Sequence, residues 1–447
     1  MANSRNSPQA SAAVVDAALA AALVERVGPG ASFAVALSGG IDSMVLLDAA
    51  ARLAPLHPLA LSAIHVHHGL SPNADRWADF CAAQCAARNV PLVTHRLRLA
   101  RERGSSLEAR ARAARYERLL SADVEVIALA HHADDQAETL LLQLLRGAGP
   151  HGLAAMPAVR VGRPALLRPL LGLARGTLAA CAAERGLAWI EDESNADRRH
   201  ARNFLRLEIV PGLAARFAGY PATLARAARN QAEAAGLADE LAAIDAAAAV
   251  DDSGLSRAGL AALSPPRARN LLRWFLREKG LRPPSEALLA EMLRQLVAAD
   301  EDARIRIAQN GAEIGTHRGR VVIHAPATPA FERVWRGEPE VVLPGGVLAF
   351  ERARGAGVAE GKLGAGRVTL RSRGGGERIR LAANRPTHAV KKLLQEARLP
   401  PWERQALPLI WSGDELAAVP GIGVALAFQA APGEPGWRVE WRPRRPG

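Results

Sequence analysis

The chain has 447 residues, of which 49% are hydrophobic and 23% charged, a composition typical of a soluble globular protein with several domains. No apolar run reaches about 18 residues, and the opening MANSRNSPQA lacks the apolar core of a signal peptide, so we expect neither a membrane span nor a leader. The net charge of +12 predicts a polyanionic partner, nucleic acid first, and the expected compartment is the cytoplasm.

The first motif lies between a predicted buried strand, residues 31–37, and an apolar helix that follows it. Two glycines let the backbone approach a ligand closely, and the free N–H groups of the helix's first turn favour phosphate. An aspartate among these donors suggests a Mg²⁺ ion between carboxylate and phosphate oxygens. The alternative is a tight turn capped by one of its serines. The predicted phosphate loop consists of Ser38, Gly39, Gly40, Ile41, Asp42 and Ser43.

Short strands and helices alternate after this loop. Strands are predicted at 59–66, 90–95 and 124–130, and helices at 72–87 and 107–120. Such alternation indicates an α/β fold with a doubly wound parallel sheet, in which ligands bind beyond the carboxyl ends of the strands. On the first of these helices, Cys81 and Cys85 are wrongly spaced for a CxxC redox motif, so we expect them to be small buried hydrophobes; with Cys181 they fit a reducing compartment.

A second group of polar residues follows the strand at 124–130. His131 and His132 precede the paired carboxylates Asp134 and Asp135, and Glu138 lies one helical turn further on. Clustered carboxylates repel each other unless a cation joins them, which again indicates Mg²⁺. The alternative is an acidic helix N-terminus with neutral histidines packed beside it.

The pattern changes beyond Gly147. An irregular loop leads to a helix that ends near Gly186, a basic stretch covers residues 198–206, and an alanine-rich helix covers residues 222–248. We expect a catalytic domain at 1–220, a helical connector at 221–249, a mainly helical domain at 250–325, a linker or unassigned segment at 326–366 and a small α+β domain at 367–447.

The motifs together resemble the tRNA(Ile)-lysidine synthetase family of the PP-loop (N-type) ATP pyrophosphatase superfamily. The resemblance spans most of residues 30–430 and implies a PP-loop fold for the first domain. It is carried by Ser38–Ser43, His131-His132-x-Asp134-Asp135-x-x-Glu138-Thr139, Arg146-Gly147-x-Gly149, Asp192-x-Ser194-Asn195, Arg202-Asn203-x-x-Arg206, Lys391-Lys392-Leu393-x-Gln395-Glu396 and Pro401-Trp402-x-Arg404.

This resemblance implies ligation of L-lysine to C2 of the wobble cytidine in a CAU-anticodon isoleucine tRNA, which then decodes AUA. ATP would be spent to AMP and pyrophosphate through an adenylated cytidine. No protein nucleophile is required, and catalysis would depend on positioning and charge neutralisation.

The resemblance also implies roles for single residues. Ser38–Ser43 would hold the phosphates of ATP, and Asp42 with Asp134 or Asp135 would hold Mg²⁺, the choice between the last two staying open. Asp42, Asp135 and Arg202 would be catalytic, and Glu138 could receive the ammonium of lysine. Arg202 and Arg206 would clamp the α-phosphate or the tRNA backbone. Their alternative is a solvated basic helix face.

The two distal domains are implied to grip the tRNA and to help exclude the methionine tRNAs that share the CAU anticodon. The candidate contacts are Arg378, Lys391 and Lys392, and two of the only four lysines in the chain are adjacent here. Trp402 could stack on a base, although a place in a core is favoured. The approach Arg385–Val390 departs from the family pattern, and the sequence leaves monomer and homodimer open.

Three other functions were weighed against this one. Cytidine 2-thiolation needs CxxC cysteines, which Cys81 and Cys85 do not supply. Amidation of the kind used in NAD or GMP synthesis would leave the arginine-rich distal domains unexplained. A nucleotide-sensing RNA-binding protein with a dead site is disfavoured by the intact Asp42, paired aspartates and two arginines.

Overall fold

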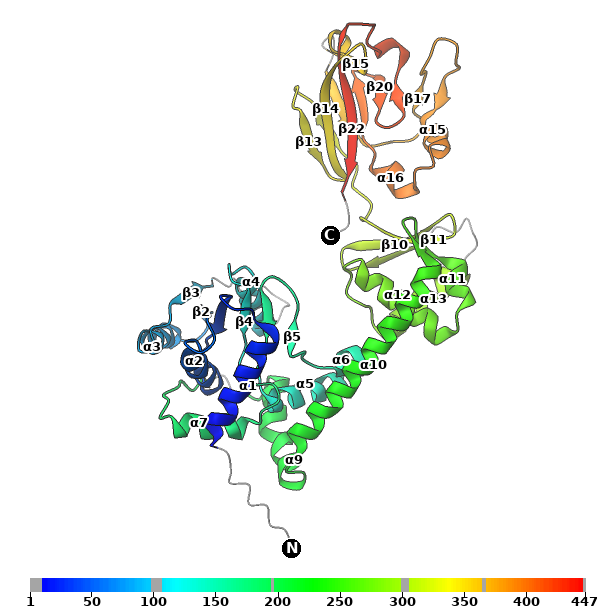
Figure 1. Ribbon diagram of the computed structural model, residues 1–447. Coiled ribbons are helices and arrows are strands. Elements are labelled where there is room, and N and C mark those ends of the chain that lie inside the picture. Colours follow the sequence, from blue (N-terminus) through cyan, green and yellow to red (C-terminus); the bar gives the residue numbers. More distant parts are fainter. Residues whose placement is uncertain (1–9, 98–106, 194–196, 299–304, 364–366, 445–447) are drawn as a thin grey trace. The chain divides into compact units, whose positions relative to one another are not determined.

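The computed structural model describes residues 10–97, 107–193, 197–298, 305–363 and 367–444 (Figure 1). It forms two compact units, Met1–Leu237 and Ala238–Gly447. Ser194 and Asn195 of the fourth motif lie outside the described residues. None of the helices in the described part of the chain is long and apolar enough to cross a membrane.

The first unit contains a six-stranded sheet in the order β3-β2-β1-β4-β6-β5, parallel except for the edge strand β5. The order runs outward in both directions from the adjacent β1 and β4, which confirms the expected doubly wound fold. The strands are β1 (Ser32–Ala36), β2 (Ala60–His67), β3 (Leu92–Arg96), β4 (Val126–Ala128), β5 (Val159–Arg160) and β6 (Ala165–Leu167).

Helices cover both faces of this sheet because its strands are apolar on both sides. On one face Val15 of α1, Met44 of α2 and Leu178 of α7 share a core with Phe33. On the other face Leu119 of α4 packs with Ile127 of β4. The helices are α1 (Ser11–Arg26), α2 (Ile41–Leu53), α3 (Ala74–Ala86), α4 (Leu107–Leu120), α5 (Ala133–Leu145), α6 (Pro150–Leu153) and α7 (Arg175–Glu184).

The basic stretch forms consecutive helical turns, α8 (Ala201–Phe204), the π-helix η2 (Leu205–Ile209) and α9 (Val210–Arg216). They lead into α10 (Tyr220–Ala249), the single long helix expected from the alanine-rich composition (Figure 1). The boundary between the two compact units falls within α10.

The second unit begins with three helices and a five-stranded antiparallel sheet around one core. The helices were expected, whereas β10 was not. Its register with β11 pairs Ile314 with Ile323, which gives the sheet one apolar face. The elements are β7 (Val250–Asp251), β8 (Gly254–Ser256), α11 (Arg257–Ala262), α12 (Pro265–Glu278), α13 (Glu286–Ala298), β9 (Arg306–Gln309), β10 (Ala312–His317) and β11 (Arg320–His324).

Residues 326–366, which the sequence left open as a linker or unassigned segment, contain several strands and a short helix. Within them β14 (Gly346–Arg354) pairs along its length with β22 (Pro435–Pro443), and Phe350 shares a core with Leu370. Glycine and proline occur here at strand ends, where they make turns between short strands. The other strands before residue 367 are β12 (Glu332–Val334), β13 (Glu340–Leu343) and β15 (Val358–Ala359), followed by α14 (Glu360–Leu363).

The remaining elements complete the α+β organisation expected for the C-terminal part. A five-stranded sheet has the order β12-β16-β19-β20-β21, and a four-stranded sheet the order β13-β14-β22-β15. Both contribute to a single core. The elements are β16 (Val368–Arg371), β17 (Arg378–Ile379), β18 (His388–Ala389), α15 (Val390–Glu396), α16 (Pro401–Ala406), β19 (Leu409–Ser412), β20 (Glu415–Val419), β21 (Gly423–Val424) and η3 (Leu426–Phe428).

Candidate active site

The predicted phosphate loop connects β1 to α2 and is closed by its own serine. Ser43 Oγ accepts hydrogen bonds from the backbone N–H groups of Ser38 and Gly39, both at 3.2 Å, and donates to the Gly40 carbonyl at 2.9 Å. Gly40 is the N-cap of α2, and no side chain caps this helix. The serines therefore shape the loop rather than cap the helix, which leaves the positive end of α2 facing the loop for an anion.

Gly39 is required by both its conformation and its neighbours. Its φ is +88°, and a Cβ there would lie 2.6 Å from Ile190 Cδ1. Ile190 N–H donates to the Gly39 carbonyl at 2.9 Å, so the segment before the fourth motif holds the loop in place. Behind the loop, the buried His65 ring contacts the Leu37 carbonyl through Nδ1 at 2.9 Å. Burial lowers the pKa of His65, which keeps this supporting ring neutral.

The start of α5 brings the second motif to the loop. His132 is the N-cap: its Nδ1 accepts from Asp135 N–H at 3.4 Å, while Asp135 Oδ2 accepts from His132 N–H at 3.2 Å. His132 Nε2 lies 3.7 Å from Asp42 Oδ2. Burial lowers the pKa of this histidine, but its hydrogen bond to Asp42 and the surrounding carboxylates outweigh burial and raise it. The motif is thus a capped helix start and also a carboxylate cluster that includes Asp42.

The carboxylates of this cluster differ in how far they are satisfied. Asp134 accepts from Arg175 N–H at 2.8 Å and from the Tyr220 hydroxyl at 3.2 Å. Asp42 Oδ1 is buried and accepts no hydrogen bond. Within the described part of the chain, no three His, Cys, Asp or Glu side chains are arranged to hold a metal ion on their own. A Mg²⁺ ion here would therefore need phosphate or water oxygens as well, and Asp42 Oδ1 fits as its protein ligand.

Glu138 is buried and holds both predicted clamp arginines. Its Oε1 accepts from Arg206 Nε and its Oε2 from Arg202 Nε, each at 2.7 Å, and Arg206 Nη2 adds a contact at 2.9 Å. Arg202 also donates to Asp135 Oδ1 at 3.0 Å. The side chains of Arg202 and Arg206 are only 28% and 27% exposed and both pair with the buried carboxylate of Glu138, so the alternative of a solvated basic helix face is wrong. Arg206 lies in the π-helical turn η2, which is typical of functional positions.

A cluster of arginines around His131 was missed from the sequence. His131 Nδ1 is buried without a hydrogen-bond partner, as are the Nε atoms of Arg115 and Arg168. Burial lowers the pKa of His131 to about 3, and the nearby positive charges of Arg168, Arg202, Arg115 and Arg112 add to this effect. Arg112 and Arg115 are three residues apart on α4, and this spacing could have predicted a shared basic helix face.

The distal candidate residues lie close together in the C-terminal part, on β17 and in the first turn of α15. Arg378 of β17 pairs in register with Ala389, directly before α15, where Lys391 and Lys392 begin the helix. All three basic side chains are exposed. Trp402 is only partly buried and stacks on His324, with ring centroids 4.1 Å apart, so the favoured place in a core is wrong.

Three family models match the chain: a PP-loop domain at residues 14–213, a TilS substrate binding domain at 255–322 and a TilS substrate C-terminal domain at 368–441. The tRNA(Ile)-lysidine synthase of Nitrosomonas europaea is 44% identical, over 94% of this chain and 93% of the relative. The chain belongs to the tRNA(Ile)-lysidine synthase family. The family member of Aromatoleum aromaticum is also 44% identical, over 93% of this chain and 98% of its own. A tRNA thiolase structure from Methanococcus maripaludis has a TM-score of 0.44 at 16% identity, over 50% of this chain and 79% of the thiolase.

The cysteines of this member of the tRNA(Ile)-lysidine synthase family lie in the protein interior. Cys81, Cys85 and Cys181 are all buried and unbonded. Burial raises the pKa of Cys81 to about 12, which keeps it a thiol at neutral pH. Cys81 and Cys85 pack in the apolar core beneath the loop, so their prediction as small buried hydrophobes is confirmed.

Proposed function

We propose that this chain ligates L-lysine to C2 of the wobble cytidine of a CAU-anticodon isoleucine tRNA, at the expense of ATP. The single observation that carries the proposal is the convergence of Ser38–Ser43, Asp42 with its unsatisfied buried oxygen, and the Glu138–Arg202–Arg206 cluster in a chain of this family. The loop is suited to pyrophosphate, and the arginines are suited to charge that develops at the α-phosphorus.

The reaction balances without a protein nucleophile. The cytidine O2 attacks the α-phosphorus of ATP, the bond to the bridging oxygen breaks, and pyrophosphate leaves with the bonding electrons. The lysine amine then attacks C2 of the adenylated cytidine, AMP leaves, and the amine loses a proton to the surroundings. The chain's contribution is to align these groups and to offset negative charge.

The phosphates would lie against the backbone N–H groups of the loop and the start of α2. Asp42 Oδ1 is the oxygen best placed to hold Mg²⁺, because both oxygens of Asp134 already accept hydrogen bonds. Asp135 shares His132 with Asp42 and would support the same ion. When bound, Mg²⁺ supplies charge neutralisation to the phosphate oxygens.

We assign Glu138 the role of holding Arg202 and Arg206 in place, because both of its oxygens already accept from guanidinium groups. An incoming α-phosphate would compete for these arginines as a bidentate acceptor. An arginine that turns to phosphate releases one Glu138 oxygen, which could then accept from the lysine ammonium. The predicted lysine contact thus depends on the phosphate contact being made first.

The distal basic residues would track the tRNA backbone. Arg378, Lys391 and Lys392 are exposed and close in the fold, as electrostatic contacts with phosphates require. Such contacts orient the RNA without reading its sequence, so discrimination against methionine tRNAs must come from further contacts.

Lysine transfer tests the proposal directly. The full chain is incubated with CAU isoleucine tRNA, ATP, Mg²⁺ and labelled lysine, and label in the tRNA is measured. We expect Asp42→Asn to lower transfer by at least 100-fold, because it removes a charge from the phosphate site. The matched control is Asp123→Asn, an exposed aspartate in the loop before β4, which should keep full transfer. Absence of transfer by the unmodified chain, or equal transfer by both variants, would overturn the proposal.

A further inference from the structure

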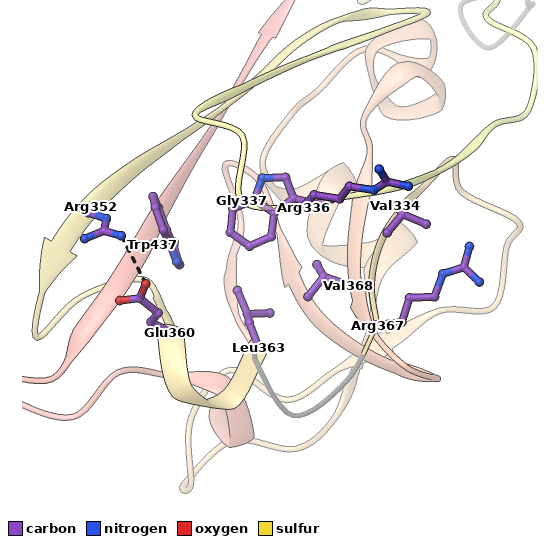
Figure 2. A pocket seen from close by; sticks show the side chains of 10 residues that line it. Val334, Arg336, Gly337, Arg352, Glu360, Leu363, Arg367, Val368 and Trp437 are labelled. Carbon is purple, nitrogen blue, oxygen red and sulfur yellow. Dashed lines mark ion pairs between the residues drawn. The ribbon is translucent and has the colours of Figure 1, made fainter.

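The C-terminal part contains a cavity of about 410 Å³ that no role assigned above uses (Figure 2). Its apolar wall includes Trp335, Leu363, Val368 and Trp437. The wall is held firmly, because Trp335 stacks on Phe350 with centroids 4.3 Å apart and meets Trp437 edge-on at 5.5 Å. Trp335 Nε1 also donates to the Glu338 carbonyl at 2.8 Å. The volume is that of a small-ligand site.

The rim of this cavity is strongly basic. Three arginines and one glutamate line it, which gives a net charge of +2. Figure 2 shows Arg336 and Arg367 extending together on one side, with Arg352 and Glu360 on the other. Arg352 lies over the Trp437 ring at 5.1 Å and within 3.5 Å of Glu360, whereas the Arg367 side chain has no ion pair or hydrogen bond to any residue that the structure describes.

We propose that this cavity, which we call the tryptophan pocket, binds one unpaired nucleotide of the tRNA. The inference rests on the proposed function, which supplies RNA as the polyanion. The base would pack against the apolar wall beside Arg352, and its phosphate would lie between Arg336 and Arg367. Aromatic and arginine contacts to a splayed base, with basic groups on the backbone, are how proteins take up single-stranded RNA.

The shape of the tryptophan pocket excludes paired RNA. A base in a duplex is stacked on both faces and cannot present its ring to a concave apolar wall. A free anion such as inorganic phosphate would use the arginines but leave the wall uncovered. A nucleotide uses both features. Most of the pocket, including Trp335, Arg336 and Arg352, also precedes the segment matched by the C-terminal domain model, at 368–441.

Binding by a double variant tests this site in the full chain. Arg336→Ala with Arg367→Ala removes two exposed side chains, so the fold should be kept. The matched control is Arg354→Ala with Arg438→Ala, two exposed arginines of β14 and β22 that do not line the pocket. We expect the pocket variant to bind tRNA about 10-fold more weakly than the control, with a salt slope about one unit smaller. A blunt RNA duplex of similar length should be bound equally by both variants.

Three outcomes would overturn the inference: equal tRNA affinity in the two variants, an equal loss for the pocket variant on the duplex, or weaker ATP binding by the pocket variant. The last would assign the pocket to a free nucleotide instead of RNA. If the unmodified chain transfers no lysine but the pocket variant still shows the selective loss of tRNA binding, the proposed function is refuted and the inference about the tryptophan pocket stands.

Discussion

Replacing Glu138 by glutamine tests the buried ion-pair cluster most sharply. The carboxylate is only 4% exposed and neutralises two guanidinium groups. Removing one member of a fully buried pair costs about 3–5 kcal/mol, whereas exposed pairs contribute less than about 1 kcal/mol. Because the two arginines keep just over a quarter of their surface in water and Arg202 retains Asp135 as an acceptor, we expect Glu138→Gln to destabilise the first unit by about 2–3 kcal/mol.

The matched control for this substitution lies in the same stretch of chain. Glu208→Gln removes the same charge from an ion pair with Arg198 whose two side chains are 39% and 71% exposed. We expect that change to cost less than about 1 kcal/mol. Hydrogen–deuterium exchange of the amides in α5 and α9 measures the opening free energy of the first unit separately from that of the second.

A double-mutant cycle completes this test. Glu138→Gln combined with Arg206→Gln should cost clearly less than the sum of the two single changes, since the second change removes a charge that the first left unpaired. If Glu138→Gln and Glu208→Gln lower the opening free energy equally, or if the cycle is additive, the cluster is not the tightly coupled unit inferred from its distances.

Three other changes probe the phosphate loop, the adjacent Lys391 and Lys392, and His131 with the arginines around it. Gly39→Ala should weaken ATP binding at least 10-fold, because it places a Cβ on a residue with left-handed backbone conformation next to packed side chains. Gly172→Ala, which has open space around it, should leave ATP binding unchanged. Calorimetric titration with ATP compares the two variants. Replacing Lys391 and Lys392 by alanine should weaken tRNA binding and lower its salt slope by about one to two units with ATP affinity unchanged, as filter binding would reveal. Burial lowers the pKa of His131 to about 3 in the folded chain, so the unfolded chain takes up a proton first and the free energy of unfolding falls as the pH drops from about 6.5 toward 3. Urea unfolding across this pH range should show a smaller loss of stability for His131→Asn than for the unmodified chain. Parallel curves for the two proteins would contradict a buried, neutral His131 ring.

The sequence predicted the parts of the first unit that are local in the chain. The glycine-rich turn lies directly between β1 and α2, and Asp134 and Asp135 lie in the first turn of α5, the next helix after β4, so short-range patterns were sufficient. Because the strands of the sheet are parallel, their carboxyl ends lie at one edge, and this alone predicts that the two loops lie close together. The sequence did not identify His132 as the N-cap of α5, because Ser, Thr, Asp and Asn are the usual N-cap residues.

The missed features depend on contacts between distant segments. The pairing of β14 with β22 joins residues such as Phe350 and Val439, and no local pattern near residue 350 identifies that partner. The strands β5 and β6 are too short to show the alternation of apolar and polar residues that identifies a strand in a sequence. The basic residues near Arg202 could be assigned to a solvated face from charge alone, and only the approach of α5 shows that Glu138 buries them.

The same contacts explain why the site can be both charged and stable before its substrates arrive. Buried ion pairs contribute little net stability, but they fix geometry when every oxygen has a donor. In the α5 cluster, Glu138 and Asp134 are satisfied by arginine, tyrosine and backbone N–H groups, whereas Asp42 keeps one buried oxygen without a donor. An unsatisfied buried carboxylate oxygen is costly unless a cation binds it. Among these carboxylates, Asp42 therefore has the greatest need for a cation, and it belongs to the loop where we propose that the phosphates of ATP lie. In the same proposal, Arg202 and Arg206 offset the negative charge of the α-phosphate.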